Sequence, residues 1–344
     1  MSMMKAISVA AAGGPDNLKY GDVNMPELTE GQVLIKVYAT ALNGADLLQR
    51  AGNYPCPPGA SEILGLEAAG IVSEVGKGVT KFKQGDKVCA LLDGGGYAEY
   101  AVAPEGFIMP MPKNLSFAEA AGIPEVFLTA YLELVMLGGL SKGQSVLIHA
   151  GASGVGTAAI QIAKQIGAQI FTTAGSQDKL DLARELGADR LINYKEENFV
   201  EVVQQQTQGP EIKAIPGGPK PAPGVNVILD LVGASHFAGN LECLTVEGKL
   251  LLVGLPSGSK AEINLALMLG KRLQVIGSTM RARPRAFKEK IVAEFSRFAG
   301  NKFETGELKP IIGTTFKLSE AKEAHEYMEA KKNKGKIVLV VQEE

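Results

Sequence analysis

The stretch LIHAGASGVG, residues 147–156, decides the fold. An apolar strand runs here into a glycine turn that opens a helix. Glycine permits positive φ and lets the backbone approach a pyrophosphate closely, while the helix N-terminus offers free N–H groups to the anion. The spacing is G-x-x-G-x-G and not the strict G-x-G-x-x-G, so a turn used only for packing is the alternative interpretation.

The sequence around this turn alternates between strands, glycine turns and helices. Helices are expected at Thr157–Ile166, ending at Gly167, and at Lys179–Leu186. The expected strands are Ser145–His149, Gln169–Thr173, Leu191–Ile192, Val225–Leu229 and Lys249–Val253. This alternation indicates a doubly wound parallel sheet covered by helices, and within that sheet the glycine turn predicts a dinucleotide site.

The end of the second strand indicates which dinucleotide binds. NAD-binding folds carry an acidic residue about 20 residues beyond the glycine turn, where it holds the ribose 2′-OH. Here the strand ends in Ala174-Gly175-Ser176 without a carboxylate, and Lys179 follows. A hydroxyl and a lysine suit a 2′-phosphate, and Tyr194 is a second candidate to close over it. We expect NADPH; the alternatives are that Lys179 is a solvated helix residue and that the nearby Asp178 only favours the helix dipole.

The first third of the chain predicts β structure. Val33, Ile35 and Val37 alternate with Leu34, Lys36 and Tyr38, which is a strand signal. Lys5–Ala11 and Tyr97–Val102 are further expected strands. The segment from Gly70 to Val88 holds short apolar pieces broken by glycines. Short strands punctuated by glycine predict a small, barrel-like antiparallel domain.

The segments outside these two regions predict helices and one closing strand. Helices are expected at Ala118–Leu137, at Arg285–Ala299 and at Ser319–Ala330, where Ser319 is a plausible N-cap. A final strand is expected at Lys336–Val341, and we expect it to return to the first domain. The expected domains are therefore residues 1–127 with 271–344, and residues 128–270.

Residues 204–224 interrupt the strand–helix rhythm with three consecutive glutamines and five prolines. We interpret this segment as a surface loop; a proline-rich partner motif is the alternative.

Bulk composition excludes several classes of function. The 344 residues include 46% hydrophobic and 21% charged side chains, which is typical of a globular protein of about two domains. The formal net charge of -2 gives no field suited to nucleic acid or an anionic membrane. No segment approaches the roughly 20 apolar residues that cross a bilayer. The short apolar run near the N-terminus predicts a first strand, with a signal peptide as the alternative.

Cysteine and histidine usage bears on compartment and metal content. The three cysteines, Cys56, Cys89 and Cys243, are widely spaced, which predicts no disulfide framework and a cytoplasmic protein. The chain also has three scattered histidines, of which His149 is expected in the core. These cysteines and histidines are the residues that could bind zinc. A zinc site needs about four such ligands in close spacing, so we expect no metal. Without a Lewis acid, hydride delivery to an electron-poor quinone or enone is easier than alcohol oxidation.

Several motifs resemble those of a known family. The stretch Gly70–Gly76, with Gly85-Asp86 and neighbouring residues, is similar to the signature of medium-chain dehydrogenases/reductases. Three further stretches resemble the zinc-free quinone oxidoreductase branch, namely Asn43–Asp46, Gly65–Glu67 and His149–Gly156. The resemblance covers nearly the whole chain and is closest to the p53-inducible type, as judged from Gln49–Ala60, Pro124–Ala130, Ala174–Ser176 and Asn333–Lys336.

This resemblance implies a GroES-like β-barrel catalytic domain, a Rossmann domain that binds NADPH, a cleft between them, and a homodimer formed through the cofactor domains. It implies that Asn43 and Thr129 flank the nicotinamide, that Tyr54 borders the acceptor, and that Ser153 lies in the cofactor turn. The candidate catalytic residues are thus Tyr54, Asn43 and Ser153. The other expected cofactor residues are Gly154, Val155, Gly156, Gly175, Ser176, Lys179, Tyr194, Gly254, Leu255, Ser278, Met280 and Lys336.

Each of these roles has a plainer alternative. Tyr54 could serve loop packing, Asn43 could be a turn residue, and Ser153 could be present because it is small. Val126-Phe127 departs from the family's more usual bulky aromatic pairing, which leaves acceptor preference open. The sequence shows no evident proton donor, and a hydroquinone product could take its proton from water.

The leading functional hypothesis is NADPH-dependent reduction of a quinone. A second is reduction of α,β-unsaturated carbonyls, either alkenals or enoyl thioesters. A thioester would need an apolar channel or a basic entrance, which Arg281, Arg283 and Arg285 could form, although a solvated approach to a helix is the plainer interpretation. A third hypothesis, from another class, is a non-enzymatic protein that binds NADPH or RNA.

Overall fold

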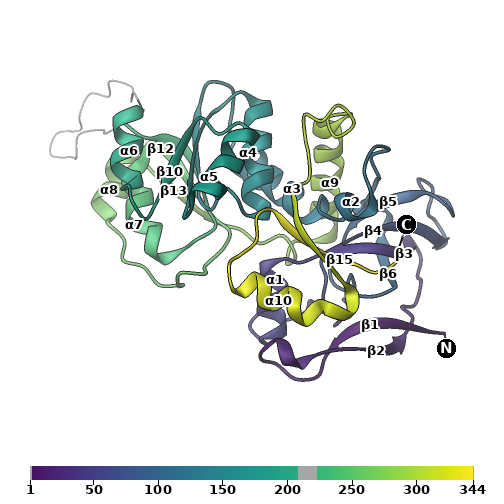
Figure 1. The fold of residues 1–344 in the computed structure, drawn as a ribbon. Helices are drawn as coiled ribbons and strands as arrows, with labels where there is room; N and C mark the ends of the chain where they lie inside the picture. Colours follow the sequence, from purple (N-terminus) through teal and green to yellow (C-terminus); the bar gives the residue numbers. More distant parts are fainter. Residues whose placement is uncertain (1, 208–222, 344) are drawn as a thin grey trace. The chain divides into compact units, whose positions relative to one another are not determined.

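The computed structural model describes residues 2–207 and 223–343, and the chain divides into two compact units. Unit 1 comprises Met1–Leu128 and Met280–Glu344, and unit 2 comprises Thr129–Thr279 (Figure 1). The predicted fold class, a GroES-like domain with a Rossmann domain, is confirmed by the sheets described below.

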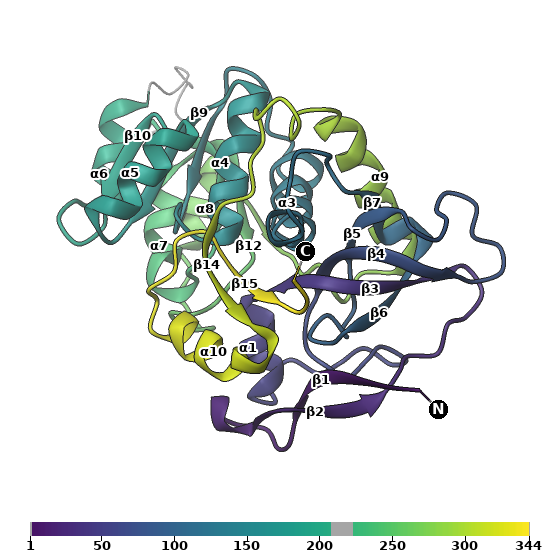
Figure 2. The ribbon, with the colours of Figure 1, turned by 45° about the vertical axis from the view of Figure 1, so that its right-hand side comes forward.

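Unit 1 is built on one large sheet and a separate hairpin (Figure 2). The sheet has the strand order β14-β15-β3-β4-β5-β7, with β6 also paired to β3. All of its pairs are antiparallel except β14 with β15. Its strands are β3 (Gln32–Ala41), β4 (Glu67–Val75), β5 (Lys87–Leu91), β6 (Tyr100–Pro104), β7 (Ile108–Pro110), β14 (Ile312–Lys317) and β15 (Lys336–Val340). The hairpin pairs β1 (Met3–Val9) with β2 (Leu18–Asn24).

Strand β3 organises this sheet because its alternating side chains are buried. Val33, Ile35 and Val37 join one apolar cluster with residues of β4, β5 and β6. A side chain at Gly70 would bring its Cβ to 2.1 Å from the carbonyl oxygen of Lys36, so only glycine allows β4 to lie so close to β3. The expected return of the final strand is confirmed, since β15 pairs antiparallel with β3 through Val338 and Ala41.

The helices that were expected agree with the structure except in two places. Helix α9 (Arg285–Ala299) has the expected bounds. The single helix expected over residues 118–137 is wrong, because Pro124 lacks an N–H group and begins a new helix. The segment is α2 (Phe117–Ala121), α3 (Pro124–Tyr131) and a π-helical turn, η3 (Leu132–Leu137). Ser319 is not an N-cap, because it lies in the 3₁₀ turn η4 (Leu318–Glu320) that precedes α10 (Ala321–Glu329).

Unit 2 is a parallel sheet of strand order β10-β9-β8-β11-β12-β13. Its strands are β8 (Ser145–Ile148), β9 (Gln169–Ala174), β10 (Arg190–Asn193), β11 (Val225–Asp230), β12 (Leu244–Leu252) and β13 (Gln274–Gly277). Its helices are α4 (Gly154–Ile166), α5 (Gln177–Leu186), α6 (Phe199–Gln206), α7 (Ala234–Cys243) and α8 (Leu265–Lys271). The chain winds outward from β8 in both directions, so the strand order reverses between β8 and β11, where such sheets bind ligands.

The expected loop over residues 204–224 is wrong at its start. Gln204, Gln205 and Gln206 form the last turn of α6, because glutamine is a good helix former and Asn198 caps the helix through the N–H of Val200. Residues 208–222 lie outside the described part of the chain, so the proline-rich interpretation stays a prediction.

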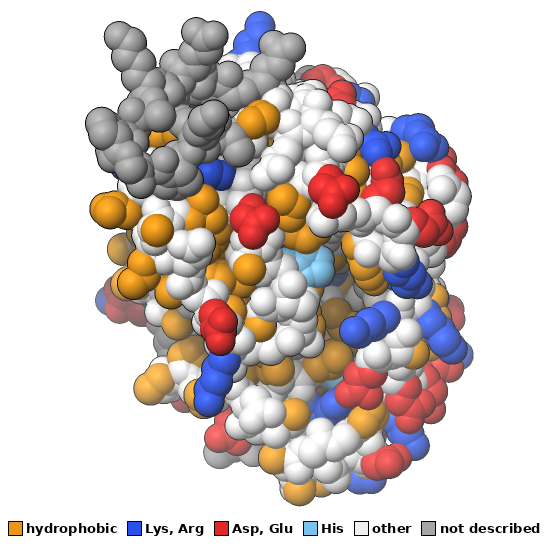
Figure 3. Space-filling model, turned by 90° about the vertical axis from the view of Figure 1, so that its left-hand side faces the viewer, with side chains coloured by type: hydrophobic (Ala, Val, Ile, Leu, Met, Phe, Trp, Pro, Cys, Tyr) orange, Lys and Arg blue, Asp and Glu red, His pale blue; other side chains and the backbone are white. Residues whose placement is uncertain are grey.

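Some large apolar side chains remain at the surface of unit 2. Leu265 and Leu269 of α8 are 71% and 80% exposed, respectively. Figure 3 shows hydrophobic side chains at the surface on the side where Figure 1 places α6, α7 and α8. Among the described residues, no helix is long and apolar enough to cross a membrane.

Candidate active site

The glycine turn of unit 2 connects β8 to α4, at the carboxyl edge of the sheet. Ala150 adopts a left-handed φ of 53°, which bends the chain sharply after the strand. A Cβ at Gly151 would come within 2.0 Å of Thr172 Oγ1, and one at Gly156 within 2.3 Å of the Ala150 carbonyl oxygen. Both glycines are therefore required for the turn to fold back on itself and on β9.

The start of α4 offers backbone donors to an anion. Ser153 is the N-cap, and its Oγ accepts the N–H of Gly156 at 3.1 Å. No described residue accepts a hydrogen bond from the N–H groups of Gly154 and Val155, which begin this helix of 13 residues. Two aimed N–H groups at the positive end of a helix suit a pyrophosphate, so the turn fits a dinucleotide. Ser153 therefore has a structural task in the turn, and its catalytic role stays a prediction.

Behind the turn, His149 is fully buried and fully hydrogen-bonded, as expected for a core residue. Its Nδ1 lies 3.0 Å from Thr173 Oγ1 and its Nε2 lies 2.7 Å from Asn240 Oδ1. Burial lowers the pKa of His149 to about 3, and the ring is therefore neutral. Because the amide oxygen of Asn240 can only accept, Nε2 carries the proton and Nδ1 accepts from Thr173. This arrangement leaves His149 no free nitrogen for catalysis.

The residues expected to choose between NAD and NADP follow β9. A Cβ at Gly175 would lie 2.5 Å from the Tyr194 hydroxyl, so the tyrosine ring lies directly across this glycine. Ser176 begins α5, but its hydroxyl donates to Asp178 Oδ1 at 2.6 Å. A carboxylate thus lies beside the hydroxyl expected to hold a 2′-phosphate. Sequence reasoning assigned Asp178 only to the helix dipole and missed this contact.

The remaining expected cofactor residues of unit 2 share the carboxyl edge of the sheet. Gly254 and Leu255 follow β12, and Leu255 is 52% exposed. Ser278 follows β13, and its N–H donates to the Leu252 carbonyl oxygen. Because the strands are parallel, all these segments leave the same edge as the glycine turn. Thr129 is buried in α3, and Met280, which is buried as well, belongs to unit 1.

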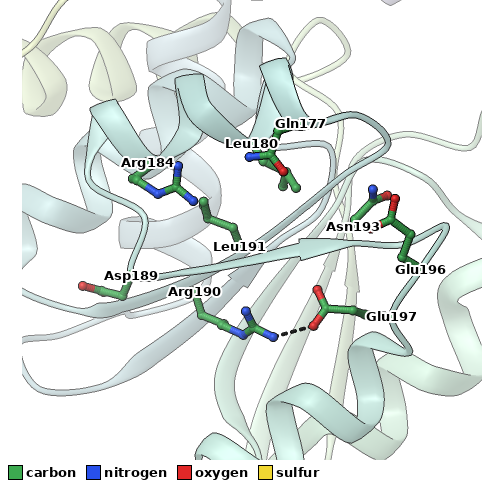
Figure 4. Close-up of a pocket in the computed structure, with 9 residues that line it drawn as sticks. All are labelled: Gln177, Leu180, Arg184, Asp189, Arg190, Leu191, Asn193, Glu196 and Glu197. Carbon is green, nitrogen blue, oxygen red and sulfur yellow. Dashed lines mark hydrogen bonds and ion pairs between the residues drawn. The ribbon is translucent and has the colours of Figure 1, made fainter.

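A pocket of about 280 Å³ lies elsewhere in unit 2, between α5 and β10 (Figure 4). It has side chains of both charges, and Arg190 forms an ion pair with Glu197 at its edge. None of the expected cofactor residues lines this pocket.

Unit 1 contains a buried group of charged and polar side chains, which we call the Glu67 cluster: Asn43, Glu67, Glu125 and Lys336. The Lys336 ammonium contacts Leu42 O at 2.7 Å, Asn43 Oδ1 at 2.6 Å and Glu67 Oε1 at 2.7 Å. Lys336 and Glu67 have side chains only 3% and 0% exposed. An ammonium group has three N–H donors, and each of the three has an acceptor here.

The same cluster orients Asn43. Its amide nitrogen donates to Glu67 Oε1 at 2.9 Å, while its oxygen accepts from Lys336. Its backbone N–H donates to Asp46 Oδ2 at 2.8 Å, at the start of α1 (Gly44–Arg50). Asn43 and Lys336 are thus brought together, but both are occupied by the cluster. Their contact with a nicotinamide ring stays a prediction.

Glu125 is the member of the cluster that sequence reasoning missed. Its backbone N–H donates to Glu67 Oε2 at 2.8 Å, at the beginning of α3. Burial, and then the negative charge of Glu67, raise the pKa of the Glu125 carboxyl to about 8. The side chain is nevertheless partly exposed. A proline followed by glutamate at a helix start was the only visible signal, and it says nothing of the carboxylate of Glu67 beside it.

Tyr54 lies in the loop after α1 and is partly exposed. The Arg281 guanidinium lies 5.6 Å from the centre of its ring. Arg281 is only 4% exposed and donates to Asp93 O, Gln49 Oε1 and Cys56 Sγ. Arg281 is therefore a buried side chain that contacts residues 51–66 between α1 and β4, which we call the Tyr54 loop, and it does not form a solvated approach to a helix. Arg285, by contrast, is exposed and pairs with Glu289.

The departure at Val126-Phe127 falls in the core of unit 1. Phe127 is 1% exposed and packs against Phe303 and Phe295, with ring centres 5.1 and 6.1 Å away. Val126 is also buried. These two side chains therefore shape the packing of α3, and the acceptor preference stays open.

A series of buried hydrogen bonds runs from Arg50 through His325 and Tyr97 to Asp46. Arg50 Nη1 lies 3.1 Å from His325 Nδ1, and His325 Nε2 lies 3.2 Å from the Tyr97 hydroxyl. Tyr97 donates to Asp46 Oδ2 at 3.3 Å. Because a guanidinium only donates, His325 Nδ1 must accept and Nε2 must carry the proton. Every bond in this series therefore points toward Asp46, whose pKa burial raises to about 6.

Within residues 2–207 and 223–343, no group of three or more His, Cys, Asp and Glu side chains is arranged to hold a metal ion. In the Glu67 cluster the cation is an ammonium group, and its partners are oxygen atoms and not the thiolates and imidazoles that zinc prefers. The donor set around Glu67 therefore does not fit a catalytic zinc.

Comparison with known proteins places this geometry in a family. The model described as zinc-binding dehydrogenase matches residues 154–297, and the alcohol dehydrogenase GroES-like domain matches residues 29–113. The quinone oxidoreductase of Rattus norvegicus is 34% identical, with 98% of each chain covered. The 2-haloacrylate reductase of a Burkholderia species is 32% identical, covering 99% of this chain and all of the relative.

Two solved structures are similar over nearly all of the chain. A structure described as an NAD-dependent alcohol dehydrogenase is 34% identical, with a TM-score of 0.83, covering 98% of this chain and all of its own. A mycobacterial protein complexed with NADPH is 28% identical, with a TM-score of 0.84 and the same coverage. The chain therefore belongs to the quinone oxidoreductase family of medium-chain dehydrogenases/reductases.

Proposed function

We propose that this oxidoreductase transfers hydride from NADPH to a quinone, without a metal ion. The observation that supports it most is the glycine turn, with its two free N–H groups, in a chain of the quinone oxidoreductase family. The bound cofactor would supply the hydride, and the protein would orient it. The N–H groups of Gly154 and Val155 would hold the pyrophosphate.

The choice of NADPH rests on the chain after β9. Ala174-Gly175-Ser176 carries no carboxylate at the strand end, Lys179 follows within one turn of α5, and Tyr194 lies across Gly175. Asp178 opposes this preference, because its carboxylate faces the Ser176 hydroxyl and would repel a 2′-phosphate. We therefore expect a preference for NADPH that is smaller than the lysine alone would give.

For the acceptor, we propose that it binds in unit 1 beside Tyr54 and the Glu67 cluster. Asn43 is held rigidly by Glu67 and Lys336, so its orientation costs no further ordering when substrate binds. Reduction of α,β-unsaturated carbonyls is the second candidate. It is favoured by the similarity to a 2-haloacrylate reductase and by a partly exposed carboxyl at Glu125, which could supply the proton that a carbon centre needs.

The test is NADPH oxidation at 340 nm with 1,2-naphthoquinone, with a 2-alkenal and with NADH in place of NADPH. Turnover of the quinone with NADPH, unchanged by a strong chelator, is the expected result. Turnover of the alkenal alone would move the assignment to the second candidate. Tight NADPH binding without turnover of either acceptor would contradict both proposed reactions. The protein would then be a non-enzymatic binding protein, and salt-dependent RNA binding is the next measurement.

We also propose a homodimer formed through unit 2. Strand β13 is the last in the order of its sheet, so one of its edges has no described partner strand. On the nearby α8, Leu265 and Leu269 are four residues apart and largely exposed, which is typical of an interface. Leu269→Glu should convert dimer to monomer in sedimentation velocity, whereas Leu48→Glu, at an exposed leucine of unit 1, should not. A wild-type monomer would contradict this assembly.

Finally, we infer that the protein works in the cytoplasm. All three cysteines are free, and two of them, Cys89 and Cys243, are buried as thiols. Free thiols persist where the surroundings are reducing. Fractionation of the source cells would test this inference.

A further inference from the structure

We propose that Glu125 is the proton donor of the reaction, giving its carboxyl proton to the acceptor as hydride arrives. This inference rests on the proposed function, because it assumes an acceptor bound beside Tyr54. It concerns a residue that the sequence did not single out.

The location of Glu125 is fixed by its own backbone. Its N–H group is bonded to Glu67 Oε2, and Pro124 begins the helix beside it. The side chain therefore leaves the first turn of α3 next to the buried Lys336–Glu67 pair. The negative charge of Glu125 raises the pKa of Tyr54, so the two side chains lie within electrostatic range of each other. Glu125 thus lies beside the buried Lys336–Glu67 pair and near Tyr54, next to which we propose that the acceptor binds.

The charges around Glu125 favour its protonated form. The Lys336 ammonium lowers the pKa of Glu125, but it is paired with Glu67, and burial together with the charge of Glu67 outweighs its attraction. The other groups that act on Glu125 are Asp46 on α1 and Asp93 after β5, both acidic. The N-terminus of α3 would favour an anion, but the N–H group of Glu125 is already taken by Glu67. Glu67, Asp46 and Asp93 all disfavour a negative charge on Glu125, and Asp93 is itself paired with Lys288, so the Glu125 carboxyl is protonated at neutral pH, in agreement with its raised pKa.

The carboxyl of Glu125 is also free to act. Among the described residues, no donor is bonded to either of its oxygens, and the side chain is partly exposed. A protonated carboxyl with no protein partner can present its O–H group to a bound molecule. The other members of the cluster cannot, because each is engaged on all sides.

The alternative donors are less suited. Asp46 is fully buried and accepts from Asn43 N, Gly65 N and Tyr97. Burial raises the pKa of the Tyr54 hydroxyl, which makes it a weaker acid than a carboxyl. The remaining alternative source of the proton is bulk water. The experiments below distinguish protonation by water from protonation by Glu125.

With a 2-alkenal as acceptor, each bond that forms is matched by a bond that breaks. The β-carbon gains hydride from the reduced nicotinamide, and the carbon–carbon π bond breaks, leaving its electron pair on the α-carbon and carbonyl oxygen. The O–H bond of Glu125 breaks, and its proton forms the new bond to the α-carbon. The bound dinucleotide would supply the hydride and with it both electrons, the alkenal is reduced, and the Glu125 carboxylate regains a proton from water. With a quinone, the same proton goes to an oxygen of the hydroquinone anion.

The first test is Glu125→Gln, with Glu62→Gln as the control at an exposed glutamate of the Tyr54 loop. General acids contribute about 10²–10⁴-fold, so we expect kcat for a 2-alkenal to fall by at least about 10²-fold in Glu125→Gln. The loss with a quinone should be smaller, because water readily protonates an oxygen anion. The wild type should lose activity as the pH rises through about 8, and this limb should vanish in Glu125→Gln but persist in Glu62→Gln.

The second test follows the proton itself. In D₂O the wild type should place deuterium on one face of the α-carbon, whereas Glu125→Gln should give a mixture of both faces in any product that it forms. An unchanged alkaline limb together with unchanged stereochemistry in Glu125→Gln would overturn the proposal.

The third test does not depend on turnover. Infrared difference spectra at pH 6 should show the C=O band of a protonated carboxylic acid that is missing from Glu125→Gln. If the wild type reduces no acceptor but this band is present, the proposed function fails while the protonated carboxyl stands. Absence of the band from the wild type overturns the inference about Glu125 in either case.

Discussion

The glycine turn and the Glu67 cluster both hold polar groups in fixed positions, but the turn leaves its polar groups unbonded and the cluster bonds them to one another. The turn uses ten consecutive residues, 147–156, and acts through backbone N–H groups that stay open. The cluster joins the side chain of Asn43, the N-cap of α1, to side chains from β4, α3 and β15, and closes nearly all of its hydrogen bonds internally. The turn is therefore built to receive a ligand, and the cluster is built to hold one side chain still and another protonated.

The largest expected effect comes from opening the cluster. Lys336→Met removes the cation from Glu67 and leaves a buried carboxylate without its partner. Breaking a buried pair in this way typically costs about 3–5 kcal/mol. We expect a loss of that size in the free energy of unfolding measured by urea titration. Lys332→Met, at an exposed lysine of the same segment, is the control and should change the free energy of unfolding little. An equally small change in Lys336→Met would show that Lys336 and Glu67 do not form the buried ion pair.

A second experiment sharpens the role of the turn's neighbours. Lys179→Ala should reduce the binding free energy of NADPH by about 1.5–3 kcal/mol if the lysine makes a charge-assisted contact with the 2′-phosphate. The binding free energy of NADH should stay nearly unchanged. Asp178→Asn removes the opposing carboxylate beside Ser176 and should shift the preference further toward NADPH. Dissociation constants from calorimetry decide this. Equal weakening of both cofactors by Lys179→Ala would disprove the assignment of the phosphate site.

The third experiment introduces a methyl group for which the glycine turn has no room. Gly151→Ala would drive a methyl group to 2.0 Å from Thr172 Oγ1, so β9 or the turn must shift. Overpacking of this kind costs about 1–3 kcal/mol, and the shift should also abolish measurable dinucleotide binding. Gly14→Ala is the matched control, because its Cβ would meet nothing within 4 Å. Full cofactor affinity in Gly151→Ala would mean that the turn does not form the phosphate site.

The smallest effect is expected at Ser153. Its Oγ caps α4, so Ser153→Ala should cost about 1 kcal/mol of stability, and Ser153→Asp should restore the cap. If the residue has only this task, kcat with saturating NADPH should stay within about twofold of the wild type in Ser153→Ala. A loss of kcat that Ser153→Asp does not restore would instead support the catalytic role implied by the family resemblance.

The contrast between the two regions also explains what the sequence could predict. The turn, the parallel sheet and the ends of its strands follow from local patterns, and β15 was placed correctly because a closing strand needs a partner sheet. The break at Pro124 carried a visible signal that was outweighed by the helical composition around it. The environment of Glu125 carried none, because it depends on Glu67 and Lys336, which lie 58 and 211 residues away in the chain. Electrostatics between distant segments has no local sequence pattern.

The position of β15 has a consequence for biosynthesis. Unit 2 is continuous in sequence, so it can fold on the ribosome as soon as Thr279 has emerged. Unit 1 cannot be completed until β15 is translated, which takes on the order of several seconds at about 5–20 residues per second. During that time the edge of β3 near Ala39–Ala41 lacks its partner strand, and the carboxylate of Glu67 lacks its lysine. Until β15 has emerged, the nascent chain exposes this strand edge, which is the place where a chaperone would protect it from pairing with other nascent chains.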